Sequence, residues 1–330
     1  MVPLVKPEDF VFAFGGHAAR HRVKPGEVFD IFTEDCFSGK LDTTAGQPRE
    51  IAPFPHVNPL TGPIAVEGLR AGGIVAVHIL ALDRARDWGV ATISPDFGLL
   101  SGTRVTPNLQ LPQAERVWIW HFDATGQSLT TETFGGRPIQ APYRPFFGTI
   151  GVAPAHGEVR LSVVPGDFGG NLDMPELRVG TTLYLRANVD GGHLYFGDGH
   201  YAQGDGEIAG TAIEGAFNAS IVADILPPQP AFDWPRFETD THVGVIGCAR
   251  PLEDAARIAT AGMIRWVAQA TELDIVDAHQ LVSQVCRLRI GNLVNPAFSA
   301  ACIVPKSALG SEVLLMEGMH RRMRPTRSPS

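Results

Sequence analysis

Short apolar runs separated by turn residues dominate the first two thirds of the chain. Within these runs β-branched and aromatic residues alternate with polar ones or follow one another, which is typical of strands. Glycine- and proline-rich pairs such as Pro25-Gly26 and Gly191-Gly192 lie between the runs and favour tight turns. The pattern predicts strands near residues 11–14, 73–80, 116–122, 148–152, 181–189 and 207–213.

After Pro235 the apolar residues recur at helical spacing instead. Residues 253–270 place Ala259 and Trp266 on one stripe, and residues 274–288 carry a second stripe. A stripe of this kind usually packs on the core of its own chain. We therefore expect two core-facing helices in this part.

Together these patterns predict a β-rich α+β fold. We expect a β-sandwich or jelly-roll-like body over residues 1–235 and an α/β C-terminal part over residues 236–320 that completes its core. Residues 321–330 are rich in arginine and poor in apolar side chains, so they are predicted to form a disordered tail. Hydrophobic residues make up 44% of the chain and charged residues 19%, a balance that suits a large buried core.

Charge and cysteine usage narrow the class of protein. The formal net charge is −8 and no long basic tract precedes the extreme C-terminus, which argues against nucleic acid as a partner. No apolar run at the start is long enough for a secretory or membrane-spanning segment, so we expect a cytoplasmic protein without a membrane partner. The four cysteines form no CxxC pair, so neither a disulfide framework nor a thiolate zinc site is indicated.

Polar functional groups are densest between residues 197 and 207. In extended chain, residues two apart face the same way, so Asp198 pairs with His200 and Asp205 pairs with Glu207. A glycine-rich reversal between the pairs would bring them to one site. Such a group suits a divalent ion that activates water, with Asp198 and His200 as ligands and Glu207 and Asp205 as catalytic carboxylates. The plain alternative is a polar surface loop.

Motifs spread over most of the chain resemble those of the acetamidase/formamidase family. The central signature is formed by Gly169-Gly170-Asn171-Leu172-Asp173, Gly197-Asp198-Gly199-His200 and Gln203-Gly204-Asp205-Gly206-Glu207. Upstream of this signature the similarity includes residues 58–64 and 145–154, and downstream it continues to Arg289-Ile290.

This resemblance implies hydrolysis of formamide, acetamide or a related small amide. It also implies a β-rich fold with an α-containing C-terminal part and assembly into a homodimer or homotetramer. A divalent metal ion is expected, with zinc as the first choice and calcium as the alternative. Cys286-Arg287 departs from the family pattern, which leaves the identity of the substrate open.

Other side chains are candidates because of their place in these motifs. Asp35 lies in a segment that matches the family and is predicted to be a metal ligand. Glu214 is separated from Glu207 by an odd number of residues, so a regular strand would place it on the opposite face, outside the cluster, whereas a β-bulge would change that. Substrate contacts are expected from Asn171, Asp173, Gln203 and His56.

Three alternatives remain at this stage. Cys36 could serve as a nucleophile with Glu34 and Lys40 beside it in sequence. Asp205 and Glu207 could form the carboxylate pair of a glycoside hydrolase, although neighbours on one strand face do not readily flank a bond. A non-enzymatic β-domain that binds a small molecule and holds a structural ion is the third.

Overall fold

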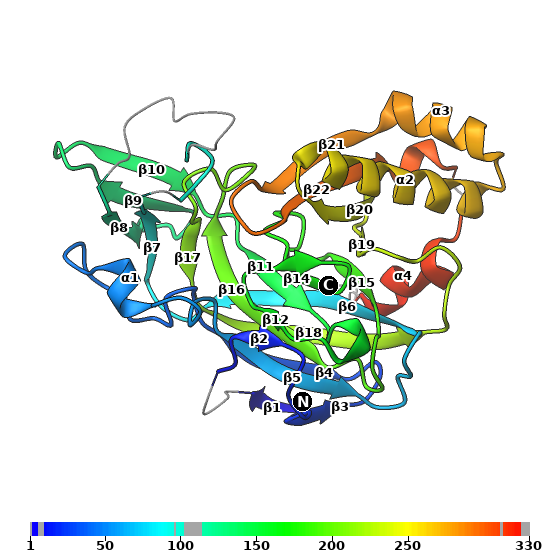
Figure 1. The fold of residues 1–330 in the computed structure, drawn as a ribbon, viewed down its shortest axis with the longest axis horizontal. Helices are drawn as coiled ribbons and strands as arrows, with labels where there is room; N and C mark the ends of the chain where they lie inside the picture. Colours follow the sequence, from blue (N-terminus) through cyan, green and yellow to red (C-terminus); the bar gives the residue numbers. More distant parts are fainter. Residues whose placement is uncertain (1, 6–9, 96, 102–113, 311–312, 325–330) are drawn as a thin grey trace.

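Two large β-sheets form the body of the molecule, and helices cover one end of it (Figure 1). The computed structural model describes residues 2–5, 10–95, 97–101, 114–310 and 313–324. The predicted β-rich α+β class is confirmed. Among the described residues, no helix has both the length and the apolar character that crossing a membrane requires.

Among the described residues, the first sheet has nine strands and runs through both halves of the chain. Its strands, in spatial order, are β1 (Val2–Val5), β4 (Val28–Thr33), β18 (Phe217–Leu226), β6 (Ile74–Arg84), β15 (Thr182–Arg186), β19 (Arg236–Glu238), β20 (His242–Ala249), β22 (Phe298–Pro305) and β21 (Arg287–Asn292).

In the part of the chain that the structure describes, the second sheet has eleven strands, of which β5 (Leu60–Val66) pairs with β16 (Leu194–Ala202) and β3 (His21–Val23) pairs with β5. A small separate pair joins β2 (Ala13–Phe14) to β12 (Arg160–Leu161). The remaining strands follow in the order β10 (Pro138–Pro142), β9 (Ser128–Glu132), β8 (Arg116–Phe122), β7 (Trp88–Ile93), β17 (Ile213–Gly215), β16 (Leu194–Ala202), β11 (Phe146–Gly151), β14 (Gly169–Asn171) and β13 (Pro165–Gly166).

Strand β6 shows how the sequence produces the layers. Alternate residues Val75 and Val77 face the core shared with Phe147 and Phe196 of the second sheet. Ile74 and the other alternate positions face the helices instead. Because both faces are buried, this strand reads as an almost continuous apolar run.

The helices lie mainly in the C-terminal part. Buried Ala259 and Trp266 lie on the stripe of α2 that was predicted from the sequence, and that stripe faces β20 and β22. The helices are α1 (Pro48–Ile51), α2 (Leu252–Thr271), α3 (Ile275–Val285) and α4 (Met319–Met323), with short 3-10 turns at η1 (Ala155–Gly157), η2 (Lys306–Ala308) and η3 (Leu315–Gly318).

Most predicted elements lie close to their observed positions, with two departures. The predicted strand at 207–213 is wrong, because Glu207 has a left-handed backbone and only residues 213–215 pair as β17. Residues 321–323, predicted to begin a disordered tail, instead end helix α4, where Met323 is buried. Residues 325–330 of that predicted tail lie outside the described part.

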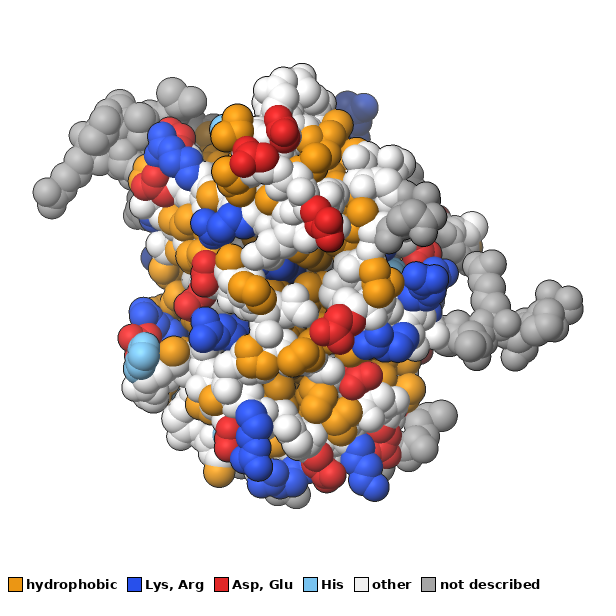
Figure 2. Space-filling view, turned by 90° about the vertical axis from the view of Figure 1, so that its right-hand side faces the viewer, with side chains coloured by type: hydrophobic (Ala, Val, Ile, Leu, Met, Phe, Trp, Pro, Cys, Tyr) orange, Lys and Arg blue, Asp and Glu red, His pale blue; other side chains and the backbone are white. Residues whose placement is uncertain are grey.

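Acidic, basic and apolar side chains are interspersed over the face that lies at the right of Figure 1 (Figure 2). Neither sign of charge forms a continuous field on this face. A mixed surface of this kind offers no electrostatic basis for binding a polyanion there.

Candidate functional site

A cluster of buried ionisable side chains forms where β14, β11, β16 and β17 lie side by side. Asp198 and His200 project from β16, Glu214 from β17, and Asp173 and Glu207 from the segments next to these strands. Each of the five is at most 6% exposed. Burying so many ionisable groups is costly unless they bind a proton, one another or an ion, which marks a functional site.

His200 lies at the centre of this cluster. Its Nδ1 is 2.9 Å from Oε1 of Gln203, whose amide nitrogen is committed to the carbonyl oxygens of Asp173 and Gly291 at 3.0 and 2.9 Å. Gln203 therefore accepts the Nδ1 proton, which leaves Nε2 directed at the carboxylates. Nε2 lies 3.4 Å from Oδ2 of Asp198 and 3.4 Å from Oε2 of Glu214.

The pKa values of the cluster reflect burial and mutual repulsion. Burial raises the pKa of Glu214 to about 7, partly offset by His200. The pKa values of Asp173 and Glu207 lie well above the ordinary value because of burial and then because of the charge of Asp198 on Asp173 and of Asp173 on Glu207. Burial acts most strongly on His200 and lowers its pKa, but Glu214 and Asp198 outweigh it and raise that pKa well above its usual value.

Backbone geometry shows that the cluster is held in an unfavourable conformation. Asp173, Asp198 and Glu207 have φ values of 48°, 55° and 49°, in the left-handed region that residues with side chains rarely adopt. Each such residue costs of order 1–3 kcal/mol, and such conformations gather at functional sites. Three of them in one cluster strengthen its assignment as the site.

Gly148 of β11 leaves the room that the cluster needs. A Cβ atom at this position would lie 2.7 Å from Oδ2 of Asp198, 2.8 Å from Cε1 of His200 and 2.9 Å from Oδ1 of Asp173. Any side chain here would displace the three groups. Glycine is therefore required at this position.

Two buried amides hold the carboxylates in place. In the orientation that satisfies its neighbours, the amide nitrogen of Asn171 donates to Oδ2 of Asp198 at 2.8 Å and to Oδ1 of Asp173 at 3.1 Å. The amide nitrogen of Asn295 donates to Oδ2 of Asp173 at 2.6 Å. Asn295 comes from the β21–β22 loop, so the C-terminal part completes the site.

The residues present fit a divalent metal ion. Nε2 of His200 and Oε2 of Glu214 are buried and have no hydrogen-bond partner at normal distance. The side chains form two possible ligand groups, Cys36–Asp198–Glu214 and Asp173–His200–Glu207. Within each group the donor atoms lie within 4.8 Å of one another. An imidazole nitrogen among carboxylate oxygens is a common donor set for such ions.

The cluster opens onto a cavity of about 690 Å³. Asn171, Asp198, Glu207 and Glu214 form its polar wall, and apolar side chains make up much of the rest. A small-molecule site is usually a mainly apolar cavity with a few convergent polar groups, as this one is.

Comparison with known proteins finds relatives in both sequence and fold. Residues 158–227 match the family model described as "Acetamidase/Formamidase family". An acetamidase crystal structure from Yersinia enterocolitica is similar, with a TM-score of 0.84 and 33% identity over 92% of this chain and 91% of that chain. An acetamidase from Bacillus halodurans has a TM-score of 0.83 and 30% identity, covering 92% of this chain and 98% of that one. This chain belongs to the acetamidase/formamidase family.

The curated relatives match over a shorter stretch. A formamidase from Methylophilus methylotrophus is 27% identical over 229 residues, which are 56% of this chain and 56% of that protein. The alignment thus spans about half the length of that relative. Membership of the acetamidase/formamidase family accounts for the fold, while the substrate depends on the residues of this chain's own cavity.

In this acetamidase/formamidase family member, Asp35 does not reach the cluster. Its Oδ1 accepts hydrogen bonds from the backbone amides of Phe37 and Gly39 at 2.8 and 2.9 Å, and its Oδ2 pairs with Arg86. Both oxygens of this buried carboxylate have partners. The structure thus places Asp35 in a turn-capping ion pair.

Asp205 and His56 also lie apart from the cluster. Asp205 is exposed and pairs with Arg289 at 2.6 Å, and it does not line the cavity. His56 is exposed and packs edge-on against Phe12, with ring centroids 5.4 Å apart. The structure brings the other predicted residues together at one place, namely Asn171, Asp173, Asp198, His200, Gln203 and Glu207.

The prediction that Glu214 lies outside the cluster is wrong. The prediction treated residues 207–214 as one regular strand, but Glu207 has a left-handed backbone and only residues 213–215 pair as β17, where Glu214 stands directly opposite His200. The alternation of side chains along a strand therefore does not relate Glu214 to Glu207. Gly148 and Asn295 were also missed, because only the fold brings these distant segments to the site.

Cys36 lines the cavity, but its surroundings do not activate a thiol. Burial and then the carboxylate of Glu214 raise its pKa well above the ordinary value. Glu34 is engaged with Arg86 at 2.6 Å, and Lys40 is exposed. A nucleophilic cysteine needs a cationic neighbour that stabilises the thiolate, and these carboxylates do the opposite.

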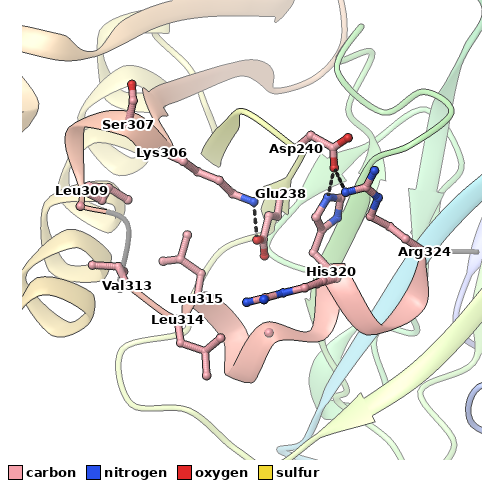
Figure 3. A pocket seen from close by; sticks show the side chains of 13 residues that line it. Glu238, Asp240, Lys306, Ser307, Leu309, Val313, Leu314, Leu315, His320 and Arg324 are labelled. Carbon is pink, nitrogen blue, oxygen red and sulfur yellow. Dashed lines mark hydrogen bonds and ion pairs between the residues drawn. The ribbon is translucent and has the colours of Figure 1, made fainter. Parts of the chain in front are cut away.

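A second cavity of about 590 Å³ lies beside α4 (Figure 3). Its two acidic side chains already have cationic partners. Glu238 pairs with Lys306 at 2.6 Å, and Asp240 pairs with His320 at 3.1 Å and Arg324 at 2.8 Å. Carboxylates committed in this way do not offer the basic groups that hydrolysis requires.

Proposed function

We propose that this chain is an amidohydrolase that releases ammonia from a carboxamide bound in the cavity walled by Asp198, Glu207 and Glu214. The observation that carries this proposal is the buried carboxylate–histidine cluster that opens onto that cavity. Similarity to proteins named acetamidase and formamidase supports the same reaction class.

We further propose that His200, Asp198 and Glu214 hold a divalent ion. Nε2 of His200 and Oε2 of Glu214 have no hydrogen-bond partner at normal distance. Oδ2 of Asp198 and Oε2 of Glu214 each lie 3.4 Å from Nε2 of His200. When bound, such an ion polarises a carbonyl group and lowers the pKa of water from ~16 towards ~7. Zinc is the proposed ion because it suits imidazole ligands, with calcium as the alternative.

Glu207 is the proposed proton carrier. It lines the cavity, and burial raises the pKa of its carboxyl group well above the ordinary value, which favours a group that can both accept and release a proton. As a carboxylate it accepts a proton from the attacking water, and it then donates a proton to the departing nitrogen. A bond forms between the water oxygen and the carbonyl carbon, the carbon–nitrogen bond breaks, and ammonia and a carboxylic acid result.

Asn171 and Asn295 are the proposed positioning residues. Their amide groups donate to Asp198 and Asp173 and so fix the orientation of both carboxylates.

A structural ion would lie in a site closed by protein ligands, whereas Asp198, Glu207 and Glu214 all face an open cavity. This exposure to the cavity favours the hydrolase over a binding domain.

Ammonia release from formamide and acetamide by the purified protein tests the proposal. We expect release by the unaltered protein, a loss of at least ~100-fold for Asp198→Asn, and no more than a small change for Asp205→Asn. The second variant is the matched control, because Asp205 belongs to the same sequence motif but is exposed outside the cavity. Equal activity of the two variants would refute the proposed site.

A further inference from the structure

The candidate cavity is much larger than formamide or acetamide requires. Its volume of about 690 Å³ lies within the range of roughly 300–1,000 Å³ that pockets for drug-sized ligands occupy. An amide of a few non-hydrogen atoms would reach only the polar wall. Most of the cavity would then contain water against apolar side chains.

Beyond the polar wall the lining is mainly apolar and comes from several separate segments. The α1–β5 connection, the segment after β7 and the β21–β22 loop each contribute. A surface assembled from distant segments in this way is suited to enclose an apolar group. The apolar side chains that matter here are Phe37, Phe54, Val57, Phe97, Val163 and Val294.

Two phenylalanine rings at the cavity are unusually accessible. Phe54 is 72% exposed and Phe97 is 45% exposed. Phe97 lies against the backbone of Gly210, where a Cβ atom would be only 2.4 Å from its Cδ1. The glycine therefore allows this ring to lie where it does. Exposed apolar side chains gathered around a hollow are typical of a binding surface.

Both arginines that line the cavity already have partners. Arg49 donates to the carbonyl oxygen of Pro95 and lies 3.7 Å from a carboxylate oxygen of Glu115. Arg250 donates to the carbonyl oxygen of Asn295 at 2.7 Å, and its guanidinium lies 4.2 Å from the ring centre of Phe298. Neither is a free cation that would select a negatively charged acyl chain.

We propose that the preferred substrate is a primary carboxamide with a bulky, uncharged apolar acyl group. The amide group lies at the wall of Asp198, Glu207 and Glu214, and the acyl group occupies the space between Phe54 and Phe97. This inference rests on the proposed amidohydrolase function and specifies its substrate class. Each methylene buried in the cavity raises kcat/KM by roughly fourfold.

Ammonia release from acetamide, butanamide, hexanamide and phenylacetamide, compared by kcat/KM, tests this inference. We expect values that rise along the aliphatic series, with hexanamide at least ~50-fold above acetamide. Phe97→Ala and Phe54→Ala should each lower the value for hexanamide roughly tenfold more than they lower the value for acetamide. Phe134→Ala is the matched control, since Phe134 is 58% exposed and does not line the cavity.

The outcomes separate the two proposals. Acetamide as the best substrate, or equal effects of Phe97→Ala and Phe134→Ala on hexanamide, would overturn the inference and leave the amidohydrolase function intact. Absence of release from every amide in the series would overturn the proposed function, and the inference with it.

Discussion

Glu207 and Glu214 are both buried carboxylates beside His200, yet their geometry suggests different roles. Oε2 of Glu214 faces Nε2 of His200 directly, and its Oε1 accepts a hydrogen bond from the backbone of Ala212 at 2.9 Å. Glu207 lines the cavity and has a raised pKa. Among the described residues, no ion pair joins Glu207 to Nε2 of His200. The first arrangement suits a ligand and the second a proton carrier.

Substitution of these two residues separates the roles. Glu207→Gln should lower kcat by roughly 10²–10⁴ while metal content per chain stays unchanged, because the proton carrier is lost and the ligands remain. Glu214→Gln should lower the metal content itself. Elemental analysis of purified variants, together with ammonia release, measures both. Loss of metal in Glu207→Gln with retention in Glu214→Gln would assign the ion to the Asp173–His200–Glu207 group instead.

Gly148 gives a steric prediction at the same scale. Gly148→Ala should abolish ammonia release and lower the free energy of unfolding by about 1–3 kcal/mol, because its methyl group would displace Asp198 and His200. Gly204→Ala is the matched control, since a Cβ there meets nothing within 4 Å. Chemical denaturation and the ammonia assay measure the two effects. Normal activity of Gly148→Ala would show that the cluster geometry is not needed.

Individual elements were largely predictable because each has a local pattern. Helix α2 and strand β8 follow from apolar spacing that is strong over many residues. The site was predictable where its residues share one motif, as Asp198 and His200 do. It was not predictable where the backbone leaves the predicted strand, as it does between Glu207 and Glu214, or where a side chain has partners elsewhere, as for Asp35.

A buried polar chain connects helix α4 to the first sheet. The hydroxyl oxygen of Thr182 on β15 lies 2.8 Å from Nδ1 of His78 on β6 and 2.8 Å from Nδ1 of His320 on α4. His320 continues the chain to Asp240 at 3.1 Å. Burial, and then the neighbouring His320, lowers the pKa of His78 to about 4, and burial also lowers the pKa of His320.

These shifts predict that the two histidines contribute less to stability in acid. Their pKa values are lowered in the folded state, whereas the unfolded chain binds protons near the ordinary histidine pKa of about 6.5. The unfolded state therefore binds more protons at these two sites below that pH, so their contribution to stability should decrease as the pH falls from about 6.5 towards about 4. Glu214, with its pKa raised to about 7, contributes with the opposite sign over this range. Urea midpoints at pH 7 and pH 5 measure this effect.

Substitution assigns the acid effect to this chain. His78→Asn should raise the urea midpoint at pH 5 relative to the midpoint at pH 7, compared with the unaltered protein, because it removes a group whose protonation favours the unfolded state. His279→Asn is the control, since His279 is exposed on α3. Equal pH dependence of the unaltered protein and His78→Asn would contradict the account.

At the scale of the whole molecule, the two parts predicted from the sequence share one sheet and one site. Strand β15 pairs with β6 on one side and with β19 on the other, so the nine-stranded sheet crosses residue 236 without interruption. Asn295 donates to Asp173, and the amide of Gly206 donates to the carbonyl of Ile290 at 3.0 Å. Neither part contains a complete site.

This continuity predicts cooperative unfolding. Calorimetry should give one transition for the full chain, because separation of residues 236–320 would expose the edge of β15 and the core beneath α2. Two resolved transitions would contradict this.

The homodimer or homotetramer expected from the family resemblance stays a prediction, which light scattering in solution would test.

The most direct test of the account is ammonia release from carboxamides after treatment with a chelator and again after addition of zinc. We predict that release is abolished by the chelator and restored by the metal, because His200, Asp198 and Glu214 are proposed to hold the ion beside the scissile amide. Release that persists undiminished after the metal has been removed would contradict the account.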